Sequence, residues 1–340
     1  MRKMFLVVVL LFIAIAGCDA KRNAIGEPDL IIVVADSSDW NAVSDKIQSA
    51  IAPIIPTPRP EGWFNLRVVP PGQMSNYMDY KNILVVSLLK ENSASMNLLD
   101  RMLSDDVLQS MQEGNQSVAK KENPWRAQQL LVIMAAPSAQ QMVELAENRG
   151  GEVRDYFDEA FNARQTKYLY GRNEQKDKAQ EYMEAFGWSI RVPRDWITIK
   201  ARPGSNFIWI GRHMPIRWLS VHWQDSPDLK MVDSTVAVEM RKTVAQELYG
   251  DIYTNTEYID VEAVNWNGKD GIRIRGLWAH EQEAKGGPFT GFVFYDNESR
   301  RLYYLDATIF APDLEKMVFL RQMEIMMRTF QTESDLPADD

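Results

Sequence analysis

Three short, mainly apolar runs in the first half of the chain restrict its fold more than any other feature. They are residues 30–35, 83–88 and 130–134, and each precedes a stretch with helical spacing. A strand without regular polar alternation is usually covered on both faces, as in a parallel sheet between helices. We therefore predict an N-terminal α/β domain over residues 29–170.

The second half has a different pattern and holds seven of the ten tryptophans, all beyond residue 180. Asn267-Gly268 is a strong signal for a two-residue hairpin turn, and residues 289–295 and 302–310 form a second hairpin pattern. Helices are predicted from Ser226-Pro227-Asp228 to residue 248 and from Pro312-Asp313 to about residue 330. These patterns predict an antiparallel sheet with packed helices.

The fold class is therefore α+β, with two α/β-sandwich-like domains, the second a mainly antiparallel sheet with packed helices. The polar stretch 171–178 marks the boundary, so the C-terminal α+β domain covers residues 171–331. Residues 332–340 are predicted to be a frayed acidic tail.

Several local predictions concern how elements begin and end. The polar side chains of residues 36–39 are interpreted as caps of the helix that follows, although a ligand site after the strand is the alternative. Residues 53–60 hold four prolines and predict an extended loop. Ser138 with Gln141 predicts a capping box, and Gly150-Gly151 is expected to stop that helix.

The first eighteen residues predict where the protein resides. Arg2 and Lys3 precede an apolar run, and small residues lead to Cys18, as in a secretory signal. Residues 15–18 (IAGC) resemble a bacterial lipobox, in which Cys18 is acylated with chains such as palmitate. We therefore expect a signal peptide over residues 1–17, a lipidated tether over residues 18–28, and attachment to membrane through the acyl chains. The expected location is the cell envelope at the outer membrane, on its periplasmic or surface face.

Composition argues against several function classes. Residues 1–17 contain Arg2 and Lys3 and no acid, so their removal takes the net charge from −9 to −11. That charge argues against nucleic acid as a partner and against a large contact with anionic lipid. Cys18 is the only cysteine, so acylation would leave no thiol for a disulfide, a nucleophile or a zinc ligand.

Cofactors and metals are not expected. The three histidines, His213, His222 and His280, lie on separate segments, and a metal site needs three or four converging ligands. The interpretation for each histidine is a hydrogen-bonded residue at a sheet edge. No phosphate loop or nucleophile elbow is present in the sequence. Acids are plentiful, so a pair of carboxylates at glycosidase spacing stays an alternative, and the sequence selects no pair.

Aromatic residues are the remaining positive signal. In residues 217–223, alternation gives Leu219, Val221 and Trp223 the core face and leaves Trp218 and His222 outside. In residues 272–280, the same rule turns Trp278 inward and puts Arg275 on the opposite face. We consider Trp218, His222, Arg275 and Trp278 as a binding surface. For Trp278 the structural alternative, core packing, is favoured.

Several short motifs together with the lipobox resemble an envelope lipoprotein family of unknown function found mainly in Bacteroidota. The resemblance covers nearly the whole mature chain and rests on residues 123–129 (NPWRAQQ), 207–210 (FIWI), 275–278 (RGLW), 286–289 (GGPF), 311–312 (AP) and 320–324 (LRQME). The strand order of the second half also resembles the PsbP-type sandwich. Neither resemblance implies catalytic residues.

The sequence as a whole favours a cell-envelope lipoprotein that acts as a non-catalytic binding or assembly module for protein or glycan. The alternative is an envelope hydrolase that uses a carboxylate pair in a cleft between the domains. Facing acids in a concave pocket would favour the hydrolase, whereas an aromatic surface without such a pair would favour binding.

Overall fold

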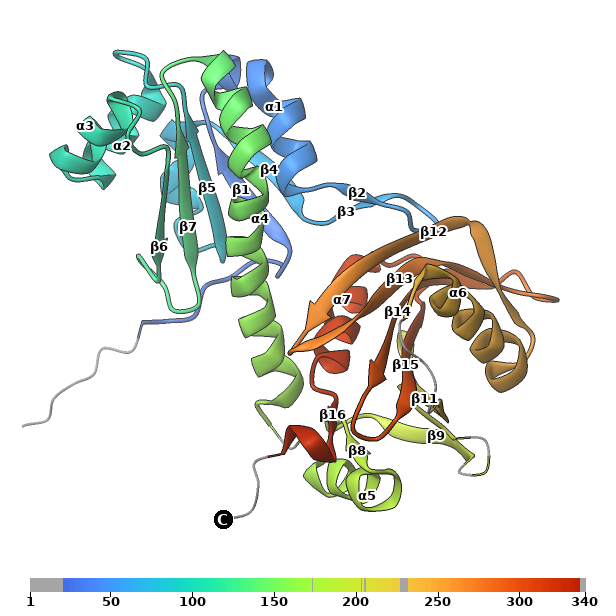
Figure 1. Cartoon of the computed structure of the whole chain (residues 1–340). Coiled ribbons are helices and arrows are strands. Elements are labelled where there is room, and N and C mark those ends of the chain that lie inside the picture. The colour runs from blue at the N-terminus through green and yellow to red at the C-terminus, as the bar shows by residue number, and fades with distance from the viewer. Residues whose placement is uncertain (1–20, 173, 203, 205, 227–231, 337–340) are drawn as a thin grey trace, which may run out of the picture.

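The protein is described by a computed structural model that covers residues 21–172, 174–202, 204, 206–226 and 232–336. Cys18 and the proposed signal peptide lie outside these residues. The described chain forms two main sheets, each with helices packed on it, and two short two-stranded sheets, so the fold class is α+β as predicted (Figure 1). None of the described helices is both long and apolar enough to cross a membrane.

The N-terminal sheet has the strand order β4-β1-β5-β7-β6, with the first four strands parallel and β6 antiparallel at one edge. Ile31 and Val33 of β1 pack against one helical layer, and Ile32 and Val34 pack against the other. Both faces of this strand are therefore buried, which explains its uninterrupted apolar sequence. The strands are β1 (Leu30–Val34), β4 (Asn65–Val69), β5 (Asn82–Ser87), β6 (Val118–Glu122) and β7 (Leu130–Ala135).

Helices α1 and α4 cover one face of this sheet, and η1, α2 and α3 cover the other (Figure 1). The predicted side-chain cap of α4 by Ser138 is confirmed. Ser138 Oγ accepts a hydrogen bond from the backbone N–H of Gln141 at 3.3 Å. The helices are α1 (Ser37–Ile51), η1 (Pro71–Asn76), α2 (Ala94–Met102), α3 (Asp105–Gln112) and α4 (Ala139–Tyr170).

Helix α4 does not stop at Gly150-Gly151, so that prediction was wrong. A Cβ atom on Gly150 would lie 2.4 Å from the Cβ of Ala50 in α1. The glycine therefore allows two helices to approach closely, and the helix continues because its later residues pack on the second domain. Phe161, Leu169 and Tyr170 belong to the core of that domain.

The second sheet is antiparallel throughout and has the order β12-β13-β14-β15-β11-β10-β9. Helix α7 and the end of α4 cover one face, and α6 with the π-helical segment η3 covers the other. The strands are β9 (Ile197–Arg202), β10 (Phe207–Arg212), β11 (Ile216–Asp225), β12 (Ile252–Trp266), β13 (Lys269–His280), β14 (Gly286–Asp296) and β15 (Arg301–Phe310). The helices are α5 (Lys176–Phe186), α6 (Ser234–Thr243), η3 (Val244–Tyr249) and α7 (Met317–Met327).

The hairpin turn predicted at Asn267-Gly268 is confirmed, since both residues have positive φ, 53° and 83°, between β12 and β13. One of the two predicted helix starts was misplaced, and the other falls partly on residues that the structure does not describe. Helix α6 begins after Asp233, whose carboxylate accepts from the N–H of Val236 at 2.9 Å. Part of the proposed start, residues 227–231, lies outside the described residues. Helix α7 begins after Lys316 rather than at Pro312-Asp313.

The C-terminal segment is more ordered than the predicted frayed tail. Strand β16 (Gln331–Thr332) pairs with β8 (Trp188–Ser189), and Thr332 with Asp335 forms a capping box on η4 (Glu333–Asp335). Asp335 also forms an ion pair with Lys269 at 2.7 Å. These contacts hold the segment because a backbone that finds a sheet partner does not fray. Residues 337–340 lie outside the described residues.

The segment predicted to be a tether also contacts the domain. Its backbone pairs with two neighbouring loops, since Ala24 N–H donates to the Ala127 carbonyl at 2.9 Å and Ile25 N–H donates to the Asp79 carbonyl at 2.8 Å. Lys21 Nζ donates to the Asn123 carbonyl at 2.6 Å. From residue 21 onward the chain is therefore packed against the sheet.

Candidate functional site

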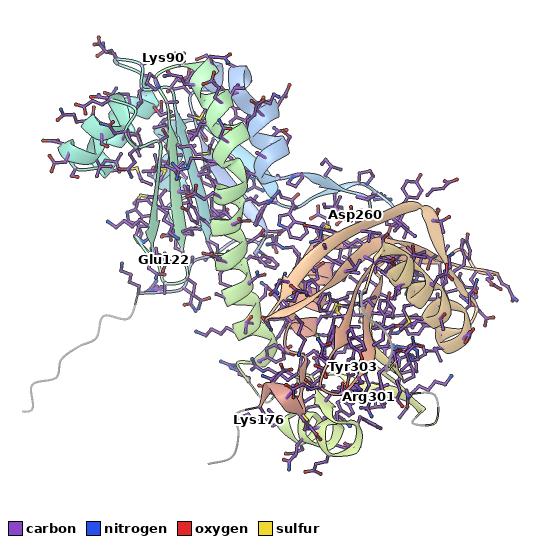
Figure 2. The ribbon with its side chains drawn as sticks, in the orientation of Figure 1. Lys90, Glu122, Lys176, Asp260, Arg301 and Tyr303 are labelled. Atoms are coloured by element: carbon purple, nitrogen blue, oxygen red, sulfur yellow. The ribbon has the colours of Figure 1, made fainter. Side chains whose placement is uncertain are left out.

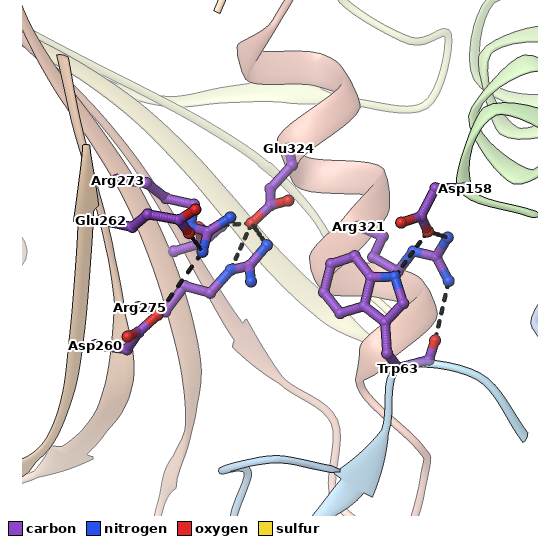
Figure 3. Close-up of polar contacts among 9 residues, drawn as sticks. Trp63, Asp158, Asp260, Glu262, Arg273, Arg275, Arg321 and Glu324 are labelled. Carbon is purple, nitrogen blue, oxygen red and sulfur yellow. Dashed lines mark hydrogen bonds and ion pairs between the residues drawn. The ribbon is translucent and has the colours of Figure 1, made fainter. Parts of the chain in front are cut away.

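A cavity of about 630 Å³ lies where α4 and a short hairpin of the first domain meet β12, β13 and α7 of the second. We call it the inter-domain cleft. Figure 3 shows the side chains that form its polar network. Its walls carry both charges: the acids are Asp155, Asp158, Glu159, Asp260, Glu262 and Glu324, and the arginines are Arg154, Arg273, Arg275, Arg321 and Arg328.

The hairpin comes from the proline-rich stretch that was predicted as an extended loop. Strand β2 (Ile54–Ile55) pairs with β3 (Glu61–Gly62), and the pair reaches from the first domain toward β12 (Figure 1). Glu61 Oε2 accepts from the backbone N–H groups of Lys316 and Met317, at 2.6 and 2.9 Å. The first domain thus supplies an anionic cap to α7, whose first N–H groups have no partner within the helix.

One junction between the domains is centred on Arg321, which is 2% exposed. Arg321 donates to Asp158 Oδ1 at 2.5 Å and to the Trp63 carbonyl at 3.0 Å (Figure 3). Its guanidinium lies 3.5 Å from the ring centroid of Phe161. Trp63 Nε1 donates to the same carboxylate oxygen at 2.7 Å. Burial raises the pKa of Asp158 and lowers the pKa of Arg321 to about 10.

The opposite wall holds a second network on β13 and α7. Alternation puts Arg273 and Arg275 on the same face of β13. Arg275 donates twice to Glu324 Oε1, at 2.8 and 2.6 Å, and Arg273 pairs with Asp260 and Glu262 of β12 (Figure 3). Burial alone would raise the pKa of Glu324. The charges of Arg275 and Arg273, with hydrogen bonds from Arg275 and Thr290, hold that pKa below its usual value.

The four residues considered as a binding surface do not form one surface. Arg275 is 8% exposed and lies in the inter-domain cleft, whereas Trp278 is 3% exposed on the other face of the sheet. Trp278 faces inward as alternation predicted, and its Nε1 donates to the Ile309 carbonyl at 3.1 Å. Arg275 is therefore an internal ion-pair partner and is not a surface contact.

Trp218 and His222 lie on the face of β11 opposite Leu219, Val221 and Trp223, as alternation predicted, but both are half-buried rather than exposed. Tyr249 of η3 covers this face, and its ring centroid lies 5.9 Å from that of Trp218. Sequence alternation correctly separated the two faces of β11 but did not show that each face has its own helical layer. His222 Nδ1 lies 3.0 Å from the Asn206 carbonyl, and burial lowers the pKa of His222.

The loop after β1 was predicted to cap α1, and the structure corrects this. Asp36 makes no side-chain cap on α1, and its carboxylate instead accepts from the N–H of Ser95 in α2 at 2.9 Å. Asp39 is 1% exposed and pairs with Lys90 at 2.6 Å. Figure 2 labels Lys90 at this end of the sheet.

Metal ligands do not gather in the part of the chain that the structure describes, where no group of three or more His, Cys, Asp or Glu side chains could hold an ion. His280 Nδ1 accepts from the N–H groups of Gln282 and Glu283, each at 3.1 Å. His280 is thus hydrogen-bonded, as interpreted from the sequence, but it lies at the end of the inner strand β13 and not on an edge strand.

Sequence reasoning missed Trp63, Asp158 and Arg321 as site residues. The reason is that their contacts join positions 95 to 258 residues apart. One signal was available: Arg321, Gln322 and Glu324 interrupt the apolar, methionine-rich sequence of α7. Charged residues on a helix that is buried all round need partners from a neighbouring element.

Comparison with known families divides the chain in two. Residues 24–170 match the model described as "Domain of unknown function (DUF8532)", and residues 174–329 match "Domain of unknown function (DUF4837)". No curated protein matches the chain. The chain is therefore covered by two domains whose descriptions give no activity.

Among solved structures, the chain is similar to the Ran-binding protein Mog1p of Saccharomyces cerevisiae, with 10% identity over 43% of this chain and 90% of that chain, and a TM-score of 0.32. A mutant of the protein Mog1 gives 11% identity over the same shares and a TM-score of 0.30. At this level the similarities assign no function to the chain.

Proposed function

We propose that the protein is a lipid-anchored binding module of the cell envelope that holds a protein or glycan partner in the inter-domain cleft without catalysis. The observation that carries this proposal is the cleft itself. It is a concave site between two domains, with both charges on its walls and a volume within the range of ligand sites. Such a site offers hydrogen-bond donors and acceptors to a polar partner.

The arrangement of the acids supports binding over hydrolysis. Asp158, Asp260, Glu262 and Glu324 each form an ion pair with an arginine. The two other acids of the cleft, Asp155 and Glu159, are one turn apart on α4 and so lie on the same wall. A glycosidase needs two carboxylates that flank the bond between them. Among the described acids of the cleft, the two that form no ion pair therefore lie on one wall and do not face each other across the cavity.

The surroundings of Trp63 also favour one class of partner over another. Trp63 lies in the cleft, but the guanidinium groups of Arg275 and Arg321 lie 4.9 and 4.7 Å from its ring. A sugar that stacks on Trp63 would compete with these cations for the ring face. We therefore place more weight on a protein segment with charged side chains than on a glycan held by stacking.

The test is crosslinking and pull-down from native membranes with variants of the exposed cleft wall. Asp155→Asn changes that wall without removing a described ion pair. We expect this variant to keep its thermal stability and to lose the crosslinked partner. Glu144→Gln on the same helix is the control of equal charge. Equal recovery of the partner with both variants would contradict a site in the cleft.

The anchor is tested separately. Cys18→Ser should leave the protein soluble or uncleaved, because acyl chains would supply its membrane affinity. Fractionation measures this directly. If the variant is processed and still sediments with membranes, the protein is not held by lipid on Cys18.

A further inference from the structure

A second cavity, of about 430 Å³, lies between α4 and the segment formed by β6 and the loop that follows it. We call it the β6 pocket. Leu130, Ala160 and Ala163 supply apolar lining, and Lys120, Arg164 and Lys167 supply positive charge. Glu122 and Glu159 also line it, and both are exposed. The buried charge of the β6 pocket is therefore positive.

Arg164 is the main evidence that this pocket has a ligand. It is 8% exposed, and among the described residues it forms hydrogen bonds only to neutral acceptors. Its Nη1 donates to the Gln128 carbonyl at 3.2 Å, and its Nη2 donates to Asn82 Oδ1 at 2.7 Å. Its Nε is buried and has no acceptor among the described residues. Buried charges are normally paired, so this guanidinium fits an anion.

Burial also lowers the pKa of Arg164 to about 10, and the charge of Arg321 acts in the same direction. The side chain thus remains a cation at neutral pH, in surroundings that supply little compensating negative charge. An anionic group in the β6 pocket would supply that charge.

The loop beside this pocket has a strained backbone held by buried hydrogen bonds. It includes residues 123–129, the first motif of the family resemblance. Asn123 and Gln128 have positive φ, 50° and 64°, which costs energy for residues other than glycine. Gln129 is 2% exposed, and its side chain accepts from two backbone N–H groups and donates to two carbonyls of the loop around residues 78–80. Backbone strain held by such a network is common at binding sites.

The described chain begins at the rim of this pocket. Lys21 contacts Asn123, which lines the pocket, and the Arg22 carbonyl accepts from the N–H of Ala127. Three peptide steps separate Cys18 from Lys21, a reach of roughly 10 Å. An acylated Cys18 would therefore hold the β6 pocket close to the lipid headgroups. This step rests on the anchor in the proposed function.

We propose that the β6 pocket binds the phosphate of an anionic lipid headgroup, with Arg164 at its base and Lys120 and Lys167 on its exposed part. The apolar lining suits the carbon atoms next to the phosphate. A single site of this kind is compatible with the overall negative charge of the protein, because one phosphate needs only a few local cations.

The test counts bound lipids by native mass spectrometry on the full chain in micelles of a non-ionic detergent. Phosphatidylglycerol should bind at a stoichiometry of one, at least tenfold more tightly than phosphatidylcholine. Lys120→Gln with Lys167→Gln should remove most of this preference. Because both side chains are exposed, this variant should fold normally. Arg164→Gln should remove it further, provided that its circular dichroism matches the wild type.

The matched control is Lys121→Gln with Lys176→Gln. Both lysines are exposed and neither lines the pocket. Figure 2 shows Lys176 on the second domain, far from Glu122 at the end of β6. The control should keep the preference for phosphatidylglycerol. Equal binding of the two lipids, or an equal effect of the two double variants, would overturn the proposal.

Inorganic phosphate distinguishes the source of the anion. If it displaces phosphatidylglycerol at equal concentration, the pocket selects a soluble phosphate and the lipid assignment is wrong. If inorganic phosphate displaces phosphatidylglycerol only at a concentration at least tenfold higher, the result supports the lipid as the ligand. Because this assay is done in micelles, its result does not depend on the fractionation of Cys18→Ser, and the two proposals can fail independently.

Discussion

Replacement of Arg321 by methionine should lower the free energy of unfolding and weaken the coupling between the two domains. The guanidinium is 2% exposed, and it joins α7 to Asp158 of α4 and to the Trp63 carbonyl. Breaking a buried ion pair by removal of one partner costs about 3–5 kcal/mol. The Asp158 side chain is 22% exposed, so water can partly replace the lost partner and the lower part of this range applies.

Methionine keeps most of the apolar volume but loses the cation–π contact with Phe161, whose centroid lies 3.5 Å away. We therefore expect a loss of roughly 3 kcal/mol, which corresponds to a melting temperature lower by about 6–12 °C. Differential scanning calorimetry of the full chain measures this loss. We also expect the transition to broaden, because the two domains would no longer unfold together.

Arg328→Met on the same helix is the matched control. Arg328 is exposed and forms no ion pair among the described residues, and its guanidinium lies 4.4 Å from the Trp266 centroid. The Arg328→Met variant should lose at most about 1 kcal/mol of its free energy of unfolding. The double variant Asp158→Leu with Arg321→Met should recover much of the stability, since no buried charge is left unpaired. If Arg321→Met melts like Arg328→Met, the junction does not couple the domains.

Three further predictions concern the second domain. Trp278→Ala should cost roughly 3–5 kcal/mol, because the side chain is 3% exposed and bonded to the Ile309 carbonyl; a thermal melt like that of the wild type would show that Trp278 is not core. Asp306→Leu should cost about 3–5 kcal/mol by leaving Arg241 buried without its ion pair at 2.8 Å, and Arg241→Met in the same chain should restore part of it, since the hydroxyl groups of Tyr249, Tyr304 and Thr308 also lose Asp306 as their acceptor; chemical denaturation that finds no rescue would contradict this account. Glu324 has a lowered pKa in the folded state, so its ionised form stabilises the fold above pH 4.5 and this contribution falls as the pH drops further. The stability difference between wild type and Glu324→Gln should therefore be largest near neutral pH and shrink below pH 4.5 in melts across that range; a constant difference would refute the ionised state of Glu324.

Local sequence patterns were sufficient for most elements of the fold. The buried run of β1, the Ser138 cap and the Asn267-Gly268 turn each depend on residues within a few positions of one another. Their structures follow from burial, capping and backbone conformation, which local sequence encodes. Alternation likewise assigned Trp278 to the inward face of β13 before any neighbour was known.

The patterns failed where the outcome depended on what packs nearby. Gly150 lies within α4 and does not end it. Its missing Cβ leaves the space that Ala50 of α1 occupies. Trp218 is half-buried because η3 covers its face of the sheet. Sequence alternation identifies that face but does not show what packs on it. Both outcomes depend on contacts between distant segments.

The inter-domain cleft and the β6 pocket were decided by tertiary structure alone. Arg321 and Asp158 are 163 residues apart, and Arg164 and Asn82 are 82 residues apart. A charged residue in a sequence has no visible partner, since pairing depends on distance in space and on exclusion of water. Local sequence patterns thus predicted the class of the fold and most of its strands and helices. Only the folded chain decided which arginines are buried, which carboxylates neutralise them, and where a positive charge remains for a ligand.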